Sequence, residues 1–176
     1  MQNFAFYSYL TGLVIFLLVL LLACLRIKKN PFVPQFALAI SVTALWMGSV
    51  LFVLRSQPLY IADTFAFETL RDAAWFFFLG VLLSKQVFNE KYVFLKKSKL
   101  SILLIIWLLT VFVVELSPGI LDFLKQTFAQ DIRFFAHVSF AIIGLMLVEQ
   151  LYRSVAAEQR WAIKYLCLGL SAIFIF

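Results

Sequence analysis

Four residues within an otherwise apolar segment have the types and spacing to do chemistry. Glu68, Arg71, Asp72 and Trp75 occupy positions i, i+3, i+4 and i+7, which places them on one face of a helix. We call this group the charged stripe. An ionisable group at the bilayer centre costs roughly 2.5–3.5 kcal/mol on insertion scales, so the stripe must face partners or water. It could bind a ligand, sense a proton or transmit a helix shift; alternatively, Arg71 only neutralises a carboxylate where the helix begins.

His137 is the single histidine of the chain. Its side chain titrates in the range of a physiological pH sensor, but a lone histidine also occurs as a packing residue hydrogen-bonded to a neighbouring helix. Both interpretations stay open. Its position in an apolar segment, near the predicted outer surface and away from ATP, argues against a role as phosphoacceptor.

A third polar group separates the last two apolar runs and is called here the inner-face signature. It consists of Glu149, Arg153, Arg160, Trp161 and Lys164. Its first two members are four residues apart in the favourable order for a helical ion pair. The basic members suit anionic lipid head groups at the inner face, although each taken alone is also explained as a topological anchor. The tryptophan fits an interfacial aromatic belt.

The composition shows what must position these residues. The chain has 176 residues, of which 64% are hydrophobic and 14% charged, and its mean hydropathy is +1.01. These values are typical of an integral membrane protein. The net charge of +6 arises at the ends of apolar segments, which argues against nucleic-acid binding.

The motifs of common catalytic sites are missing from the sequence. Cys24 and Cys167 lie in apolar runs without a second Cys or His at metal-ligand spacing, so neither zinc nor a disulfide is predicted. There is no glycine-rich phosphate loop, no Ser/His/Asp arrangement and no pair of carboxylates across a soluble cleft. We therefore expect residues 1–176 to be non-catalytic and to hold no cofactor or metal.

The apolar runs predict an all-α fold, a polytopic bundle of about six transmembrane helices. The predicted spans are residues 4–25, 34–54, 64–84, 100–117, 132–152 and 158–176. The third must carry the charged stripe, because residues 73–84 alone fall short of the roughly 20 residues that a span needs. Between the fourth and fifth, the spacing of Ile120, Leu121, Leu124 and Phe128 predicts a short helix lying in the membrane interface.

The distribution of basic residues predicts the orientation. The first, third and fifth loops carry three, five and three Lys or Arg residues, whereas the opposite loops carry Arg55, Lys125 and Arg133. By the positive-inside rule, the amino terminus lies outside. The last twelve residues are uncharged and contain no helix-stop signal, so we expect the chain to be a fragment of a longer protein.

Two passages of the sequence resemble a known family. Residues 70–75 (LRDAAW), and more strongly residues 148–153 (VEQLYR) followed by residues 159–169 (QRWAIKYLCLG), are similar to the amino-terminal membrane region of the PrsK family. Its members are sensor histidine kinases associated with the PEP-CTERM/exosortase protein-sorting system of Gram-negative bacteria. The resemblance covers the whole chain in layout, but only these passages in residue detail.

The resemblance implies a multi-pass sensor in the bacterial inner (cytoplasmic) membrane. In such proteins the chain continues into a GAF-like domain and a kinase core, which uses ATP and Mg²⁺ and phosphorylates a histidine. A response regulator then receives the phosphate on an aspartate, and the kinases are usually homodimers. None of the kinase motifs falls within residues 1–176, so residues 1–176 would be the sensor or anchor region alone.

Two other functions remain open from the sequence. The charged third segment also fits part of a small-molecule transporter or channel, although the six glycines and four prolines offer few broken helices. The same membrane region could also serve another signalling enzyme. For a sensor, we expect a stimulus near Glu68, Arg71 and Asp72 to shift the helices and to be transmitted to the inner-face signature.

Overall fold

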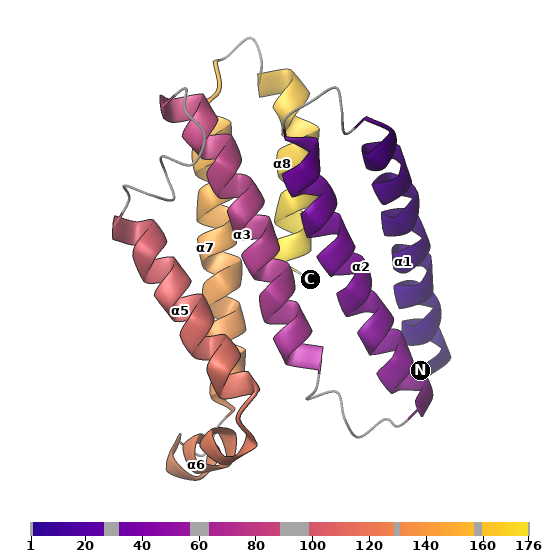
Figure 1. The fold of residues 1–176 in the computed structure, drawn as a ribbon, viewed down its shortest axis with the longest axis vertical. Helices are drawn as coiled ribbons and strands as arrows, with labels where there is room; N and C mark the ends of the chain where they lie inside the picture. The colour runs from indigo at the N-terminus through magenta and orange to yellow at the C-terminus, as the bar shows by residue number, and fades with distance from the viewer. Residues whose placement is uncertain are drawn as a thin grey trace. The chain divides into compact units, whose positions relative to one another are not determined.

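The computed structural model describes residues 2–26, 32–56, 64–88, 99–128, 131–156 and 160–175, and the regular structure in these ranges is helical. The helices are α1 (Gln2–Leu25), α2 (Val33–Ser56), α3 (Phe65–Phe88), α5 (Lys99–Glu115), α6 (Pro118–Phe128), α7 (Ile132–Ser154) and α8 (Arg160–Ile175) (Figure 1). The predicted all-α fold is therefore confirmed. Most of the predicted basic third loop, and residue 158 at the predicted start of the last span, lie outside the described residues.

Within the described ranges, three helices are long and apolar enough to cross a membrane, namely Phe4–Leu25 of α1, α2 and α7. They correspond to three of the predicted spans, residues 4–25, 34–54 and 132–152. The bent pair of α5 and α6 counts as a fourth if it forms a single span. The chain is thus a multi-pass membrane protein by the length and composition of its helices.

Two of the remaining predicted spans, residues 64–84 and 158–176, differ from an ordinary lipid-facing transmembrane helix. Helix α3 covers the predicted span 64–84, but it contains Glu68, Arg71, Asp72 and Lys85, too many charges for an ordinary lipid-facing span. Helix α8 has 16 residues, fewer than the roughly 20 that a perpendicular span requires. Six spans and an external amino terminus therefore stay predictions.

A sharp break separates α5 from α6. The two helices meet at 98°, and Pro118 occupies the first position of α6. Proline has no N–H and is favoured at this position, while it prevents α5 from continuing. The Ser117 carbonyl accepts hydrogen bonds from the N–H groups of Ile120 and Leu121, both at 3.1 Å. The predicted short helix is confirmed, and its location in the membrane interface stays a prediction.

The chain forms two compact units, Met1–Trp75 and Phe76–Phe176. In the first unit, α1 packs along α2, and a Cβ atom built on Gly12 of α1 would lie 3.2 Å from Cε of Met47 of α2. Small side chains allow helix backbones to approach closely without a hydrophobic driving force. Most of α1 is left uncovered, since only 6% of its apolar window is buried.

In the second unit, α7 packs against α8 at Gly144, next to aromatic rings from α3, α7 and α8. A Cβ atom built on Gly144 would lie 2.5 Å from the ring of Phe174. Phe174 stacks on Phe76, with ring centroids 5.3 Å apart, and Phe76 meets Phe140 edge-to-face at 6.1 Å. This close contact requires glycine at position 144, because any side chain would push Phe174 away.

Replacing Gly144 with alanine should therefore destabilise the α7–α8 contact by about 1–3 kcal/mol, the usual cost of overpacking. Unfolding in mixed micelles with increasing SDS measures this change. The matched control is Gly169→Ala in α8, where an added Cβ meets nothing within 4 Å and should be neutral or stabilising by up to about 1 kcal/mol. Equal stabilities of the two variants would contradict this account of the packing.

Candidate functional site

The charged stripe is buried in the first unit. Arg71 and Asp72 are only 4% and 3% exposed. The guanidinium of Arg71 donates from Nε and Nη2 to Oδ1 of Asp72, at 3.1 and 3.0 Å. Its Nη2 also lies 3.6 Å from Oε1 of Glu68. One cation thus compensates the buried Asp72 and the partly buried Glu68, whose side chain is 22% exposed, and such compensation is what burying charged groups requires.

The face of α3 that carries the stripe is packed against α2. The guanidinium carbon of Arg71 lies 4.3 Å from the ring centroid of Trp46, within the range of a cation–π interaction. Trp75 donates from Nε1 to Oγ1 of Thr43 at 3.0 Å. Its ring meets Phe36 edge-to-face at 6.1 Å. The prediction that the stripe faces something other than lipid is confirmed, whereas its role in sensing stays a prediction.

Replacing Arg71 with alanine should cost about 3–5 kcal/mol of stability, because two carboxylates would then lack their compensating cation. Arg71→Lys should recover part of this loss, since an ammonium group keeps the charge without the planar fork. SDS unfolding at pH 7 measures both variants. Arg153→Ala is the control, because Arg153 forms an exposed ion pair with Glu149. Such a pair contributes only about 0.3–0.5 kcal/mol. A similar stability change in Arg71→Ala and Arg153→Ala would show that the stripe is not a compensated buried cluster.

A second polar cluster lies in the second unit and joins α5 to α7. Oε1 of Glu115 and Nε2 of His137 are 3.0 Å apart, and their side chains are 1% and 12% exposed. Trp107 of α5 donates from Nε1 to Oγ of Ser139 at 3.0 Å. His137 is therefore a hydrogen-bonded residue between two helices. A pH-sensing role for His137 stays a prediction.

The start of α7 is held by an acidic cap. Asp131 accepts a hydrogen bond from the backbone N–H of Arg133 at 3.2 Å and one from its Nε at 2.8 Å. Lys125 of α6 lies 3.5 Å from Oδ2 of the same carboxylate. The side-chain hydrogen bond from Arg133, aided by the backbone hydrogen bond and the nearby positive charges, lowers the pKa of Asp131 to about 2.

This cap and the Glu115–His137 pair were not predicted from the sequence. An aspartate directly before an apolar run is a helix-start signal, so Asp131 could have been found. The partner of His137 could not, since it is 22 residues away on another helix. The Coulombic attraction between Arg133 and Glu115 connects the cap to the buried pair.

Replacing Arg133 with glutamine should raise the pKa of Asp131 from about 2 toward 3.8, the ordinary value for this carboxyl. A lowered folded-state pKa contributes stability that is present above the unfolded pKa and is lost as pH falls through about 2. The carboxyl ¹³C shift of Asp131 measures the titration. Lys125→Gln is the control and should shift the pKa less, because its Coulombic contribution is the smallest cause. A larger shift in the control would overturn this assignment.

The inner-face signature lies at the end of α7 and the start of α8. Arg153 pairs with Glu149 at 2.6 Å, and the side chains are 76% and 58% exposed, so the predicted ion pair is confirmed. Arg160 donates from Nε to the carbonyl of Val155 at 3.1 Å and lies 5.7 Å from the ring of Tyr152. A basic group is favourable beside the last carbonyls of a helix.

The remaining two members of the signature are exposed. Trp161 meets Tyr165 edge-to-face at 5.9 Å, and Lys164 lies on the same first turns of α8. Exposed aromatic and basic side chains at a helix end are typical of the membrane–water boundary. The structure thus places Arg160 of α8 against the last residues of α7, while the binding of lipid head groups by these basic residues stays a prediction.

Among the described residues, no group of three or more His, Cys, Asp or Glu side chains could hold a metal ion. Comparisons with known protein families, with curated proteins and with solved structures find no match. The resemblance to the sensor kinases is therefore supported by the sequence motifs alone.

Proposed function

We propose that this chain is the membrane-embedded sensory and anchoring module of a bacterial two-component sensor histidine kinase of the PEP-CTERM/exosortase system. The structural observation that carries the proposal is the buried Glu115–His137 pair, which joins α5 to the beginning of α7. The motif similarity at residues 70–75 and 148–169 supports the choice of protein class. In this proposal ATP, Mg²⁺, the phosphorylated histidine and the contacts with the response regulator belong to domains outside residues 1–176.

In this proposal the Glu115–His137 pair has two states, one in which the two side chains are joined and one in which they are separated. A change in its protonation, or a ligand that competes for either partner, alters the attraction between α5 and α7. Helix α7 is continuous over its 23 residues and is therefore about 34 Å long, enough to cross the bilayer. A displacement at His137 then reaches Glu149 and Arg153 on the same rigid helix. This is a common form of transmembrane signalling by helix shifts.

The test uses the full-length protein in proteoliposomes with ATP and Mg²⁺, and it measures phosphohistidine formation at external pH 5.5 and 7.5. Coupling free energies of allosteric systems correspond to about 5–150-fold, so His137→Gln and Glu115→Gln should each change the rate or its pH ratio by about fivefold or more. Asp122→Asn, an exposed position of α6, is the control and should behave as wild type.

Two results would count against the proposal at different levels. Absence of phosphohistidine in the wild-type protein would exclude the kinase function. Normal membrane insertion of both variants, together with wild-type phosphorylation rates at both pH values, would exclude the Glu115–His137 pair as the transmitting element.

A transporter is the second candidate, favoured by the 98° break between α5 and α6, which has the geometry of a broken span or a re-entrant loop. Transporters place substrate sites at such breaks. Proteoliposomes loaded with a pH-sensitive dye would reveal proton-coupled flux. Flux that is lost in Glu115→Gln, with no phosphohistidine formed, would favour the transporter over the kinase module.

A further inference from the structure

Helix α6 connects the two helices that carry the Glu115–His137 pair. Glu115 is the last residue of α5, and α6 begins three residues later at Pro118. At its other end, α6 stops at Phe128, three residues before Asp131 caps α7. His137 then lies within the first two turns of α7. A displacement of α6 therefore acts on both partners of the pair through connections only a few residues long.

The backbone between α5 and α6 is held by hydrogen bonds on both sides of the bend. The N–H of Leu116 donates to the Phe112 carbonyl at 3.1 Å. The N–H of Ser117 donates to the Val114 carbonyl, also at 3.1 Å, and the Ser117 carbonyl accepts two N–H groups from the first turn of α6. Because these bonds satisfy the helix ends at the 98° break, α6 and the end of α5 move together.

Charged side chains continue the connection from α6 to α7 and α5. Lys125 of α6 lies 3.5 Å from Oδ2 of Asp131. The same carboxylate accepts from Nε of Arg133 at 2.8 Å, and the side chain of Arg133 is only 7% exposed. Its positive charge attracts Glu115. Opposite charges therefore alternate from the polar side of α6 to the buried pair.

The apolar side of α6 is uncovered, since none of its residues is buried. Ile120 and Phe128 are 44% and 58% exposed. At 100° per residue, the apolar side chains fall on one arc of the helix and the polar ones on the opposite arc. The apolar arc consists of Ile120, Leu121, Leu124 and Phe128, and the polar arc of Asp122, Lys125 and Gln126.

The position of α6 brings this apolar arc to the membrane interface. Figure 1 shows α6 lying across the end of α5, at 98° to it. Helix α7, which follows directly, is long and apolar enough to cross the membrane. The polar arc excludes a place in the hydrocarbon core. An amphipathic helix at the interface inserts its apolar side about 5–10 Å, and its binding is sensitive to lipid composition and curvature.

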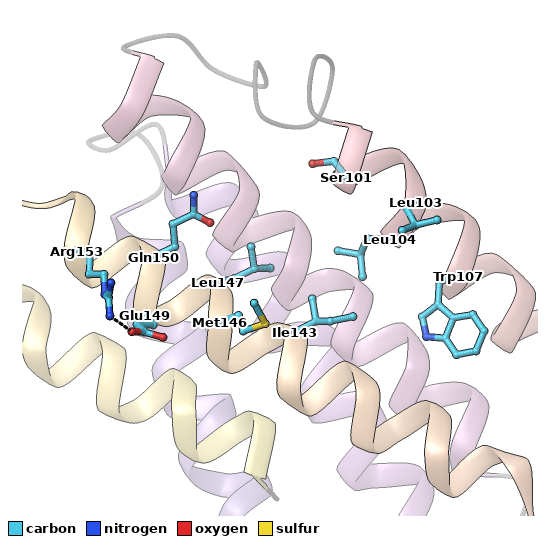
Figure 2. A pocket seen from close by; sticks show the side chains of 10 residues that line it. All are labelled: Ser101, Leu103, Leu104, Trp107, Ile143, Met146, Leu147, Glu149, Gln150 and Arg153. Atoms are coloured by element: carbon cyan, nitrogen blue, oxygen red, sulfur yellow. Dashed lines mark ion pairs between the residues drawn. The ribbon is translucent and has the colours of Figure 1, made fainter.

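Along their other ends, α5 and α7 are less tightly joined. They border an open groove of about 810 Å³, and Figure 2 shows Leu103 and Leu104 of α5 on one side of it and Met146 of α7 on the other (Figure 2). At one end of the groove, Trp107 donates to Ser139 at 3.0 Å. Interlocked side chains therefore do not fix the distance between the two helices along the groove, and a shift at the α6 end can change it.

We propose that α6 is the element through which the module senses the membrane, and that the depth of its insertion sets the position of α5 relative to α7 at the Glu115–His137 pair. The stimulus is the packing of the lipids around α6, which lie in the outer leaflet in the predicted orientation. The inference rests on the proposed kinase function only for its output, because the insertion of α6 and the movement of α5 are measured without phosphorylation.

Spin-label accessibility in phosphatidylcholine proteoliposomes tests the placement of α6. Labels are introduced by Ile120→Cys and Gln126→Cys in the full-length protein, whose native cysteines, including Cys24 and Cys167, are replaced by alanine. Oxygen, which dissolves in lipid, should relax the label at position 120 more strongly. A water-soluble nickel chelate should favour the label at position 126. Equal accessibility of the two positions to both reagents would overturn the placement.

The distance between α5 and α7 tests the coupling. Labels from Leu109→Cys and Ile142→Cys, at exposed positions of α5 and α7, report this distance by double electron–electron resonance. Phe128→Asp should reduce insertion of α6 and shift the distance by about 1–2 Å, the usual size of helix shifts in signalling. Gln126→Asp adds the same charge to the polar arc and is the matched control, which should leave the distance unchanged.

The unsubstituted α6 provides a second measurement, because a charged substitution can also destabilise the fold. Lysophosphatidylcholine added to the proteoliposomes loosens lipid packing without adding net charge, so it should deepen α6 and shift the distance in the opposite direction to Phe128→Asp. An unchanged distance under both treatments would make α6 a passive anchor and overturn the coupling. Equal shifts in Phe128→Asp and Gln126→Asp would also overturn it, since the added charge alone would then be the cause.

Phosphohistidine formation, measured in the same proteoliposomes, separates this inference from the proposed function. The expected distance shifts, accompanied by a changed phosphorylation rate, would support both. The same shifts with phosphorylation absent or unaffected would support membrane sensing by α6 and count against the kinase module.

Discussion

A charge inside an apolar helix bundle requires a compensating partner within the same bundle, because neither lipid nor aliphatic side chains can solvate it. This requirement determines the packing of α3 in the first unit. Arg71 lies within reach of Asp72 and Glu68 and against the ring of Trp46. The helix therefore turns its polar face toward α2. The charges that make α3 unsuitable as a lipid-facing span also specify which face it buries.

The same requirement acts where α5, α6 and α7 meet. Glu115 finds His137 across the helix interface, and Asp131 is held by Arg133 and Lys125. The Glu115–His137 pair joins α5 to α7, and the Lys125–Asp131 pair joins α6 to the start of α7. Apolar contacts between lipid-exposed helices offer little directional preference, so these polar contacts define the register of α5 against α7.

Helix α7 combines several of these features. Its first turns hold the acidic cap and the Glu115–His137 pair, its middle borders an open groove together with α5, and its last turn carries Arg153.

The amino-acid sequence by itself determined the all-helical, membrane-spanning character, the short helix after the fourth predicted span and the Glu149–Arg153 pair. These features depend on local hydropathy, on helical spacing and on residues one turn apart. It also indicated that the charged stripe avoids lipid. The partners of that stripe, the contact of His137 with Glu115 and the groove between α5 and α7 were decided only by the tertiary structure. They join residues distant in the chain, and a single sequence contains no record of which helix faces are packed together.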